Sequence, residues 1–121
     1  MIPYALVVED DPMVAELFQR ALQDAGFQTE ILENGHKAQA QLMFTTPDLI
    51  LLDLYLPSLS GKVILRQIGG QQRLGRTHVV VVTGDKTASE SYSGLADQVL
   101  VKPVGYEQLR KLAQHYLTMS V

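Results

Sequence analysis

Polar residues that could take part in chemistry directly follow four separate apolar runs of this sequence. Each run has the length of a β-strand. The polar residues are Glu9, Asp10 and Asp11 after the first run, Asp53 after another, then Thr83, and finally Lys102. Because the carboxyl ends of parallel strands meet at one edge of a sheet, we expect these carboxylates, the hydroxyl and the ammonium to gather there.

Carboxylates gathered at one edge repel each other and need a counter-charge. Lys102 supplies one positive charge, and a divalent cation is the usual further source. A site made of oxygen ligands favours Mg²⁺ or Mn²⁺ over zinc. With the cation bound, an acyl phosphate on Asp53 would share its charge between metal and ammonium, which is electrostatic catalysis of phosphoryl transfer. Each residue alone has an ordinary explanation, such as a helix N-cap for Asp11 before Pro12, so the prediction depends on the combination.

Strand-like and helix-like segments that could position these residues alternate along the chain. The strand-like runs are residues 4–8, 27–32, 49–52, 79–82 and 99–101. Helical patterns cover residues 13–25 and 106–117, open at Asn34 and at Ser60, and are weak in the polar stretch 85–95. The helix that opens at Asn34 should carry Ala38, Leu42 and Met43 and end before Pro47. The apolar face after Ser60 should consist of Val63, Ile64 and Ile68.

Three of the strand-like runs, 4–8, 49–52 and 79–82, are apolar on both faces, as strands between two helix layers must be. Five βα units with right-handed crossovers give a doubly wound parallel sheet. We therefore predict a flavodoxin-like (βα)5 fold of the α/β class, with five parallel strands in the order 2-1-3-4-5 and a single domain over residues 1–121.

Composition narrows the possible functions. The 121 residues are 46% hydrophobic and carry a net charge of −3, which argues against a nucleic-acid-binding surface. The absence of cysteine excludes disulfides and thiolate metal sites. No apolar run approaches the roughly 18 residues that span a membrane, and the first residues lack the features of a signal peptide. We expect a cytoplasmic protein that binds neither nucleic acid nor membrane.

Four strings carry a family resemblance that covers essentially the whole chain. They are LVVEDDP at residues 6–12, PDLILLDLYLPSLSG at 47–61, VVVVTG at 79–84 and VLVKP at 99–103. Together they resemble the receiver domains of two-component response regulators, including chemotaxis regulators. The resemblance implies that Asp53 is the phosphoacceptor. It also implies that the metal is bound by Asp10, by Glu9 directly or through water, by Asp53 and by the backbone carbonyl of Tyr55.

The same resemblance implies roles for two further site residues. Thr83 would hydrogen-bond a phosphoryl oxygen, with the Gly84 amide nearby, and Lys102 would ion-pair with the phosphoryl group. The bond between Lys102 and Pro103 would be cis. No other cofactor is expected.

The function implied is a phosphorylation switch. A sensor histidine kinase or phosphotransfer protein would phosphorylate Asp53, and the domain would signal to a downstream protein or output domain. It would not be an enzyme beyond its own phosphoryl transfer and dephosphorylation. A pseudo-receiver that binds partners without phosphate is the alternative. An aspartyl phosphohydrolase ranks last, because Tyr55 stands where those enzymes carry a second aspartate.

The chain departs from the family pattern on the side of its last strand. Val99 stands where many receivers have an aromatic residue that moves on activation, and the stretch 83–102 is about three residues short. Gln98 and Leu112 replace the charge pair used by a large group of dimerising receivers. We therefore expect no phosphorylation-driven dimer through this face. The departures at Val99 and in the short stretch favour the pseudo-receiver alternative, whereas the complete acidic site favours a working switch.

Residues 55 and 85 flank the approach to the phosphoryl group in the family fold. The ring of Tyr55 should cover part of that approach, whereas Asp85 could orient a water molecule. We expect the steric effect to dominate and the phosphoryl group to be lost slowly. On this reasoning Tyr55→Asn speeds its loss, and Asp85→Ala slows it slightly or not at all.

Overall fold

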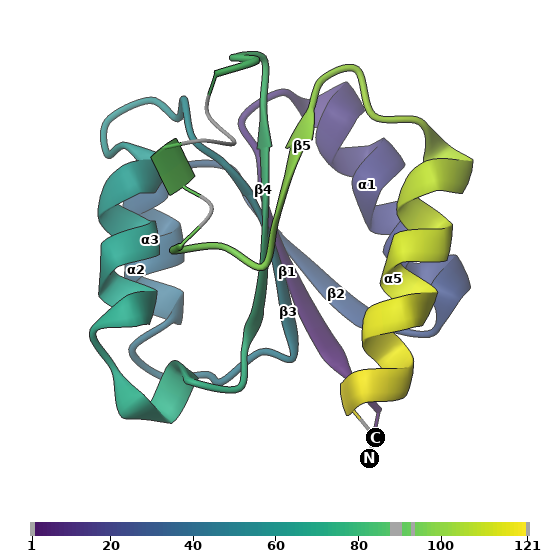
Figure 1. Cartoon of the computed structure of the whole chain (residues 1–121), viewed down its shortest axis with the longest axis horizontal. Coiled ribbons are helices and arrows are strands. Elements are labelled where there is room, and N and C mark those ends of the chain that lie inside the picture. The colour runs from purple at the N-terminus through teal and green to yellow at the C-terminus, as the bar shows by residue number, and fades with distance from the viewer. Residues whose placement is uncertain (1, 88–90, 93, 121) are drawn as a thin grey trace.

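Five parallel strands lie between two layers of helices in the computed structural model, which describes residues 2–87, 91–92 and 94–120 (Figure 1). The strand order is β2-β1-β3-β4-β5, which confirms the predicted flavodoxin-like α/β fold. The strands are β1 (Tyr4–Val8), β2 (Gln28–Leu32), β3 (Leu49–Asp53), β4 (His78–Thr83) and β5 (Gln98–Val101). The helices are α1 (Pro12–Ala25), α2 (Gly35–Gln41), α3 (Gly61–Gly69), the short 3-10 helix η1 (Gln72–Leu74) and α5 (Tyr106–Ser120).

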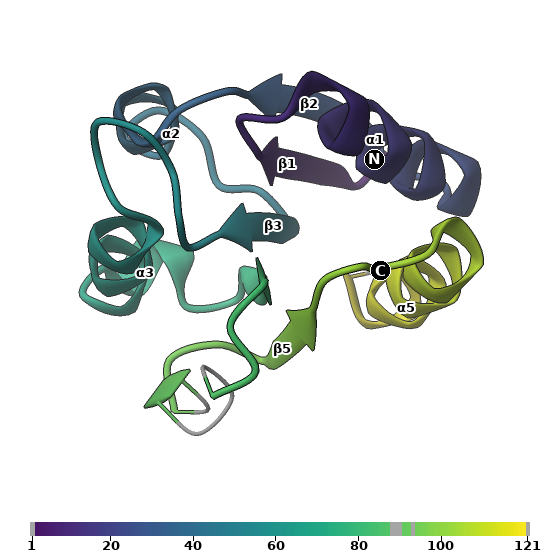
Figure 2. The same cartoon turned by 90° about the horizontal axis from the view of Figure 1, so that it is seen from above.

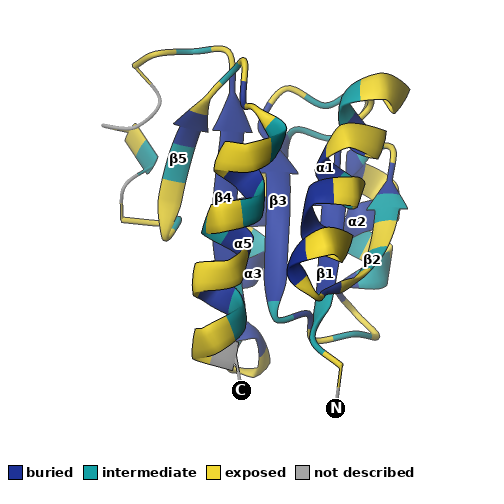
Figure 3. Ribbon diagram, turned by 90° about the vertical axis from the view of Figure 1, so that its right-hand side faces the viewer, coloured by how far each residue is buried: buried dark blue, intermediate teal, exposed yellow. Residues whose placement is uncertain are grey.

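Each face of the sheet has its own hydrophobic core. Seen from above, α1 and α5 lie on one side of the sheet, and α2 and α3 lie on the other (Figure 2). Every residue of β3 is buried, and so is every residue of β1 and β4 after the first (Figure 3). This confirms the prediction that these strands are covered on both faces. β2 alternates between exposed and less exposed positions, as an edge strand does.

The helices begin where their N-cap residues predicted. The Asp11 carboxylate accepts hydrogen bonds from the amides of Met13 (2.9 Å) and Val14 (3.4 Å), so it caps α1. Asn34 and Ser60 cap α2 and α3 in the same way. Gly26 ends α1 with a φ of 122°, a conformation that glycine adopts without strain.

The expected extent of α2 is wrong. This helix ends at Gln41, so Leu42 is only its C-cap, and Met43 lies beyond it and is exposed. The guanidinium of Arg73, from η1, donates hydrogen bonds to the carbonyls of Leu42 and Thr45. These carbonyls are hydrogen-bonded to a distant residue instead of to a further turn of helix. The helix can therefore end well before Pro47.

The expected buried face of α3 is also partly wrong. Ile64 and Ile68 are buried as expected, but Val63 is 39% exposed and Leu65 is fully buried in its place. Leu65 packs into the core because it lies four residues after Gly61, which sits directly against β3. α5 extends to Ser120 rather than ending at Leu117.

The weakly helical prediction for residues 85–95 falls partly outside the described residues, of which Ser91 and Tyr92 are helical. Val99 packs against the core on the α2–α3 side. Gln98 accepts a hydrogen bond from the Tyr116 hydroxyl, and Leu112 packs into the α1–α5 core. Both residues thus have contacts within the chain, and the absence of a dimer through this face stays a prediction. No helix among the described residues is long and apolar enough to cross a membrane.

Ser58 adopts a backbone conformation that is unfavourable for any residue except glycine. Its φ is 70°, and across it the Leu59 amide donates a hydrogen bond to the Pro57 carbonyl (2.8 Å). This tight turn lies in the loop between β3 and α3. Holding a non-glycine residue there costs on the order of 1 kcal/mol.

We expect Ser58→Gly to raise the free energy of unfolding by about 0.5 to 1 kcal/mol, because relief of this strain exceeds the entropy that glycine adds to the unfolded chain. Ser58→Ala is the control, since alanine keeps the strain. Thermal unfolding measures both, and the glycine variant should melt a few degrees above the alanine variant. A glycine variant that melts below the alanine variant would contradict the prediction.

Candidate functional site

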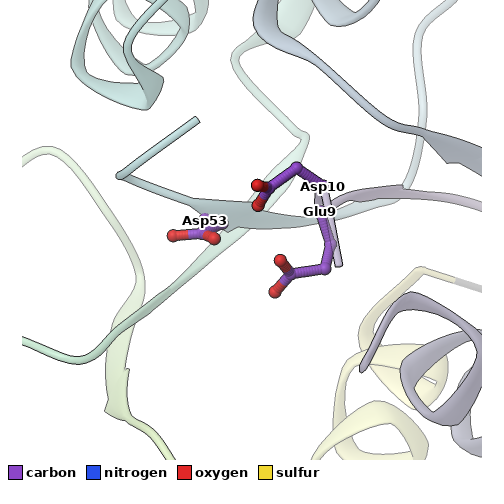
Figure 4. Close-up of side chains that lie close together, drawn as sticks. All are labelled: Glu9, Asp10 and Asp53. Atoms are coloured by element: carbon purple, nitrogen blue, oxygen red, sulfur yellow. The ribbon is translucent and has the colours of Figure 1, made fainter. Parts of the chain in front are cut away.

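Three carboxylates meet where β1 and β3 end. Glu9 follows β1, Asp10 comes next, and Asp53 is the last residue of β3. One oxygen from each lies within 4.8 Å of the others, and the three side chains gather at one place (Figure 4). Glu9 and Asp53 are buried, with 2% and 6% of their surface exposed, whereas Asp10 is exposed. The acids at the ends of the apolar runs in the sequence predicted this cluster.

Strand pairing explains why residues so far apart meet. Val8 pairs with Leu52, so the acids that follow each of them are neighbours. Thr83 pairs with Val101, and the Lys102 amide donates a hydrogen bond to the Thr83 carbonyl (2.8 Å). The carboxyl ends of β1, β3, β4 and β5 therefore form one continuous rim.

Lys102 brings the only cationic group that forms an ion pair with this cluster among the described residues. Its Nζ lies 2.8 Å from Glu9 Oε1 and 3.4 Å from Asp53 Oδ2. The bond between Lys102 and Pro103 is cis, as the resemblance implied. Asp11 lies at the edge of this arrangement: its carboxylate caps α1, and its amide donates to Glu9 Oε2 (3.2 Å). Asp11 therefore serves as the helix cap, whereas Glu9, Asp10 and Asp53 form the acidic cluster.

Burial and the neighbouring charges shift the protonation of Glu9 and Lys102. Burial, together with the nearby charge of Asp53, raises the pKa of the Glu9 carboxyl despite hydrogen bonds from Lys102 and the Asp11 amide. Burial alone would lower the pKa of the Lys102 ammonium, but the Glu9 hydrogen bond and the charges of Asp53 and Glu9 outweigh it and raise this pKa. Both groups therefore hold their protons more tightly than in water, Glu9 mainly because it is buried and Lys102 because of the two acids beside it. This donor set of carboxylate oxygens suits a hard divalent cation such as Mg²⁺.

Two backbone amides, one in the loop after β3 and one in the loop after β4, donate hydrogen bonds to site residues. The Tyr55 amide donates to Asp53 Oδ1 (3.0 Å), which fixes the orientation of this carboxylate. The Asp85 amide donates to the hydroxyl oxygen of Thr83 (3.1 Å), and Thr83 is fully buried. A hydroxyl that accepts one hydrogen bond can still donate its own hydrogen to another group.

A hydrogen bond between two rim side chains was missed from the sequence. The Tyr55 hydroxyl donates to Asp85 Oδ2 at 3.2 Å, although the two residues are 30 positions apart. Both residues were expected beside the approach to Asp53, but not in contact with each other. Only their matching positions, two residues after Asp53 and two after Thr83, could have suggested the pairing.

Comparison with known proteins decides the family. The model of the response regulator receiver domain family matches residues 5–114. The chain is a receiver domain of the two-component response regulators. The receiver domain is 31% identical over 112 residues to the phosphate regulon transcriptional regulatory protein PhoB of Rhizobium meliloti, covering 90% of this chain and 49% of the relative. It is 33% identical over 107 residues to the response regulator ArlR of Staphylococcus saprophyticus, covering 86% and 47%. The chain thus spans about half the length of these curated relatives.

Solved structures agree with this assignment. The receiver domain superposes with a TM-score of 0.84 and 32% identity on the signal receiver domain of a signal transduction histidine kinase from Syntrophus aciditrophicus, covering 97% of this chain and 91% of that one. A CheY-like response regulator receiver domain from Methylobacillus flagellatus gives a TM-score of 0.84 at 28% identity, covering 96% and 99%. The family is one of signalling partners of histidine kinases rather than of conventional enzymes.

Proposed function

We propose that this receiver domain accepts a phosphoryl group on Asp53 from a histidine kinase or phosphotransfer protein, with Mg²⁺ or Mn²⁺ bound beside it. The observation that carries the proposal is the meeting of Glu9, Asp10 and Asp53 within 4.8 Å, with Lys102 Nζ in contact with two of them. The ion pairs with Lys102 orient Glu9 and Asp53. Three carboxylates beside one ammonium leave negative charge that a divalent cation would neutralise.

The chemistry is a transfer between two nucleophiles. A carboxylate oxygen of Asp53 forms a bond to phosphorus, the phosphorus–nitrogen bond of a phosphohistidine breaks, and the histidine nitrogen keeps the electron pair. A bound divalent cation would neutralise charge on the phosphoryl oxygens. The residues that would hold it are Glu9, Asp10, Asp53 and the Tyr55 carbonyl.

The remaining site residues would act on the product. Lys102, whose Nζ contacts Glu9 and Asp53, would follow the negative charge from the carboxylate onto the phosphoryl group. Thr83 would donate its hydroxyl hydrogen to a phosphoryl oxygen. Since the same hydroxyl accepts a hydrogen bond from the Asp85 amide, this contact would link phosphorylation to the loop after β4.

Intact mass tests the proposal most directly. After incubation with acetyl phosphate or phosphoramidate and Mg²⁺, the protein should gain the mass of one phosphoryl group, and EDTA should prevent the gain. A folded protein that gains no mass with either donor would contradict the proposal and favour the pseudo-receiver alternative, a binding module that works without phosphate.

Mg²⁺ should stabilise the fold, because the cation binds only where the three carboxylates are gathered. At a concentration one hundred times its dissociation constant, the gain in unfolding free energy is about 2.7 kcal/mol. Thermal unfolding with a titration of MgCl₂ measures it. The control is Asp10→Asn, which removes an exposed ligand and should reduce the gain while leaving the fold intact. Equal shifts in both proteins would place the cation elsewhere.

A further inference from the structure

We propose that the cavity between the end of α3 and the chain entering β5 binds an arginine side chain of a partner polypeptide, together with an apolar neighbour of that arginine. The cavity has a volume of about 420 Å³, within the range of protein ligand sites. It lies at the end of the sheet away from the acidic cluster. The proposal therefore goes beyond the proposed function and does not depend on phosphorylation.

Three segments of the chain meet around this cavity, at the end of the sheet where β4 and β5 begin (Figure 1). The first is the end of α3 at Gly69 and Gly70, the second is Gly75, which follows η1, and the third holds Leu95 and Asp97 just before β5. The third segment belongs to the stretch 83–102, which is about three residues shorter than the family pattern. The cavity therefore adjoins a departure of this chain from its family.

The polar part of the cavity wall carries negative charge. Among the described residues that line the cavity, Asp97 is the only charged one. The wall also includes the C-terminus of α3, where the last carbonyl groups give the helix end a partial negative charge. A cation bound here would therefore meet an anion and a favourable helix end, without a competing positive charge among these lining residues.

Asp97 holds its carboxylate in place with one oxygen and leaves the other exposed to a ligand. Oδ2 accepts a hydrogen bond from the Val79 amide (2.6 Å), and the Asp97 amide donates to the Val79 carbonyl (2.8 Å). Oδ1 lies 3.9 Å from Nδ1 of His78, which is beyond hydrogen-bonding distance. Because the side chain is 45% exposed, Oδ1 can accept hydrogen bonds from a guanidinium in the cavity.

Asp48 shows the same backbone arrangement without the cavity. Its Oδ2 accepts a hydrogen bond from the Tyr4 amide (2.8 Å), and its own amide donates to the Tyr4 carbonyl (2.7 Å). Asp48 thus ties the start of β3 to β1 as Asp97 ties the start of β5 to β4. It is less exposed than Asp97 and does not line the cavity. An effect that Asp97 has and Asp48 lacks therefore belongs to the cavity and not to the strand ends.

The apolar part of the wall explains why an apolar neighbour should accompany the cation. Leu74 and Val79 are buried, whereas Leu95 is 49% exposed. Covering Leu95 with a partner side chain would remove apolar surface from water. Arginine suits the mixed wall, because its methylene groups pack on apolar surface while its planar guanidinium presents several donors to carboxylate and carbonyl oxygens. The single ammonium of lysine offers no such fork.

NMR titration of the ¹⁵N-labelled, unphosphorylated protein tests the site with two dipeptides. The probe is acetyl-Leu-Arg-amide, and the control peptide carries citrulline, which has the shape of arginine without its charge. Mg²⁺ is present to compete for the acidic cluster. The arginine peptide should shift the amides of Gly69, Leu95 and Asp97, and it should bind about three- to tenfold more tightly than the citrulline peptide, the range expected for a charged hydrogen bond at a half-exposed site.

Three variants assign the effect to the wall. Asp97→Asn removes the charge but keeps an oxygen for the Val79 amide, and it should bind the arginine peptide no better than the parent binds the citrulline peptide. Asp48→Asn, the matched control, should bind the arginine peptide as the parent does. Leu95→Ser should weaken both peptides by a similar factor, because it removes apolar contact and leaves the charge.

Equal affinity of the parent for the two peptides would overturn the proposal, whether or not the Asp97→Asn protein folds. So would shifts confined to the amides around Asp10 and Asp53, because the cation would then bind at the acidic cluster. A loss of binding in Asp48→Asn as large as that in Asp97→Asn would place the effect at the strand ends and would also contradict the site. A parent that binds the peptide as described but takes no phosphoryl group would contradict only the proposed function.

Discussion

Asp53→Asn should gain no phosphoryl mass under conditions that label the parent completely. The asparagine side chain is nearly the same size, but its amide carries no charge and is a far weaker nucleophile than a carboxylate. The Lys102–Glu9 ion pair does not involve Asp53 and should persist. The variant should therefore fold, and relief of repulsion among the acids should leave its stability equal to or above that of the parent.

Asp11→Asn is the matched control for this experiment. It makes the same chemical change two residues from Glu9, at a carboxylate that serves as the N-cap of α1. Asparagine caps helices as well as aspartate does, so the control should fold and label like the parent. Labelling of Asp53→Asn at the parent's rate would show that another residue takes the phosphoryl group and that Asp53 is not the phosphoacceptor.

Gly61→Ala should destabilise the fold by about 3 kcal/mol, at the upper end of the cost of overpacking. A Cβ at this position would lie 2.3 Å from the carbonyl oxygen of Asp53 and 2.7 Å from the Cα of Leu54. Both are backbone atoms, and the Gly61 amide also donates to the Leu54 carbonyl (3.0 Å). Neither backbone segment can therefore move away without weakening this hydrogen bond. The displacement would reach Asp53 itself, so slower labelling should accompany the loss of stability.

Gly69→Ala tests the same change at the other end of α3, where a Cβ would meet nothing within 4 Å. Alanine favours the helix over glycine by roughly 0.5 to 1 kcal/mol, so this variant should be at least as stable as the parent. Urea unfolding compares the two. A Gly61→Ala protein whose stability lies within about 0.5 kcal/mol of the parent would mean that the loop before α3 yields more easily than the close contact implies.

The sequence alone was enough to predict the sheet and the acidic cluster. Apolar runs followed by Glu9, Asp53, Thr83 and Lys102 could be placed on one rim, because parallel strands in a doubly wound sheet all end at the same edge. The caps Asp11, Asn34 and Ser60 were equally predictable, since each bonds to an amide two or three residues away. Such short-range rules need no knowledge of the rest of the fold.

Tertiary structure decided the features that depend on residues far apart in sequence. α2 ends early because Arg73 binds the carbonyls of Leu42 and Thr45, about 30 residues away. Gly61 must lack a side chain because the backbone of β3 passes directly against it. The hydrogen bond between Tyr55 and Asp85 exists because two neighbouring strands bring their following loops close together. Local pattern shows which residues gather at the rim, and only the packing of distant backbone and side chains decides how they are held there.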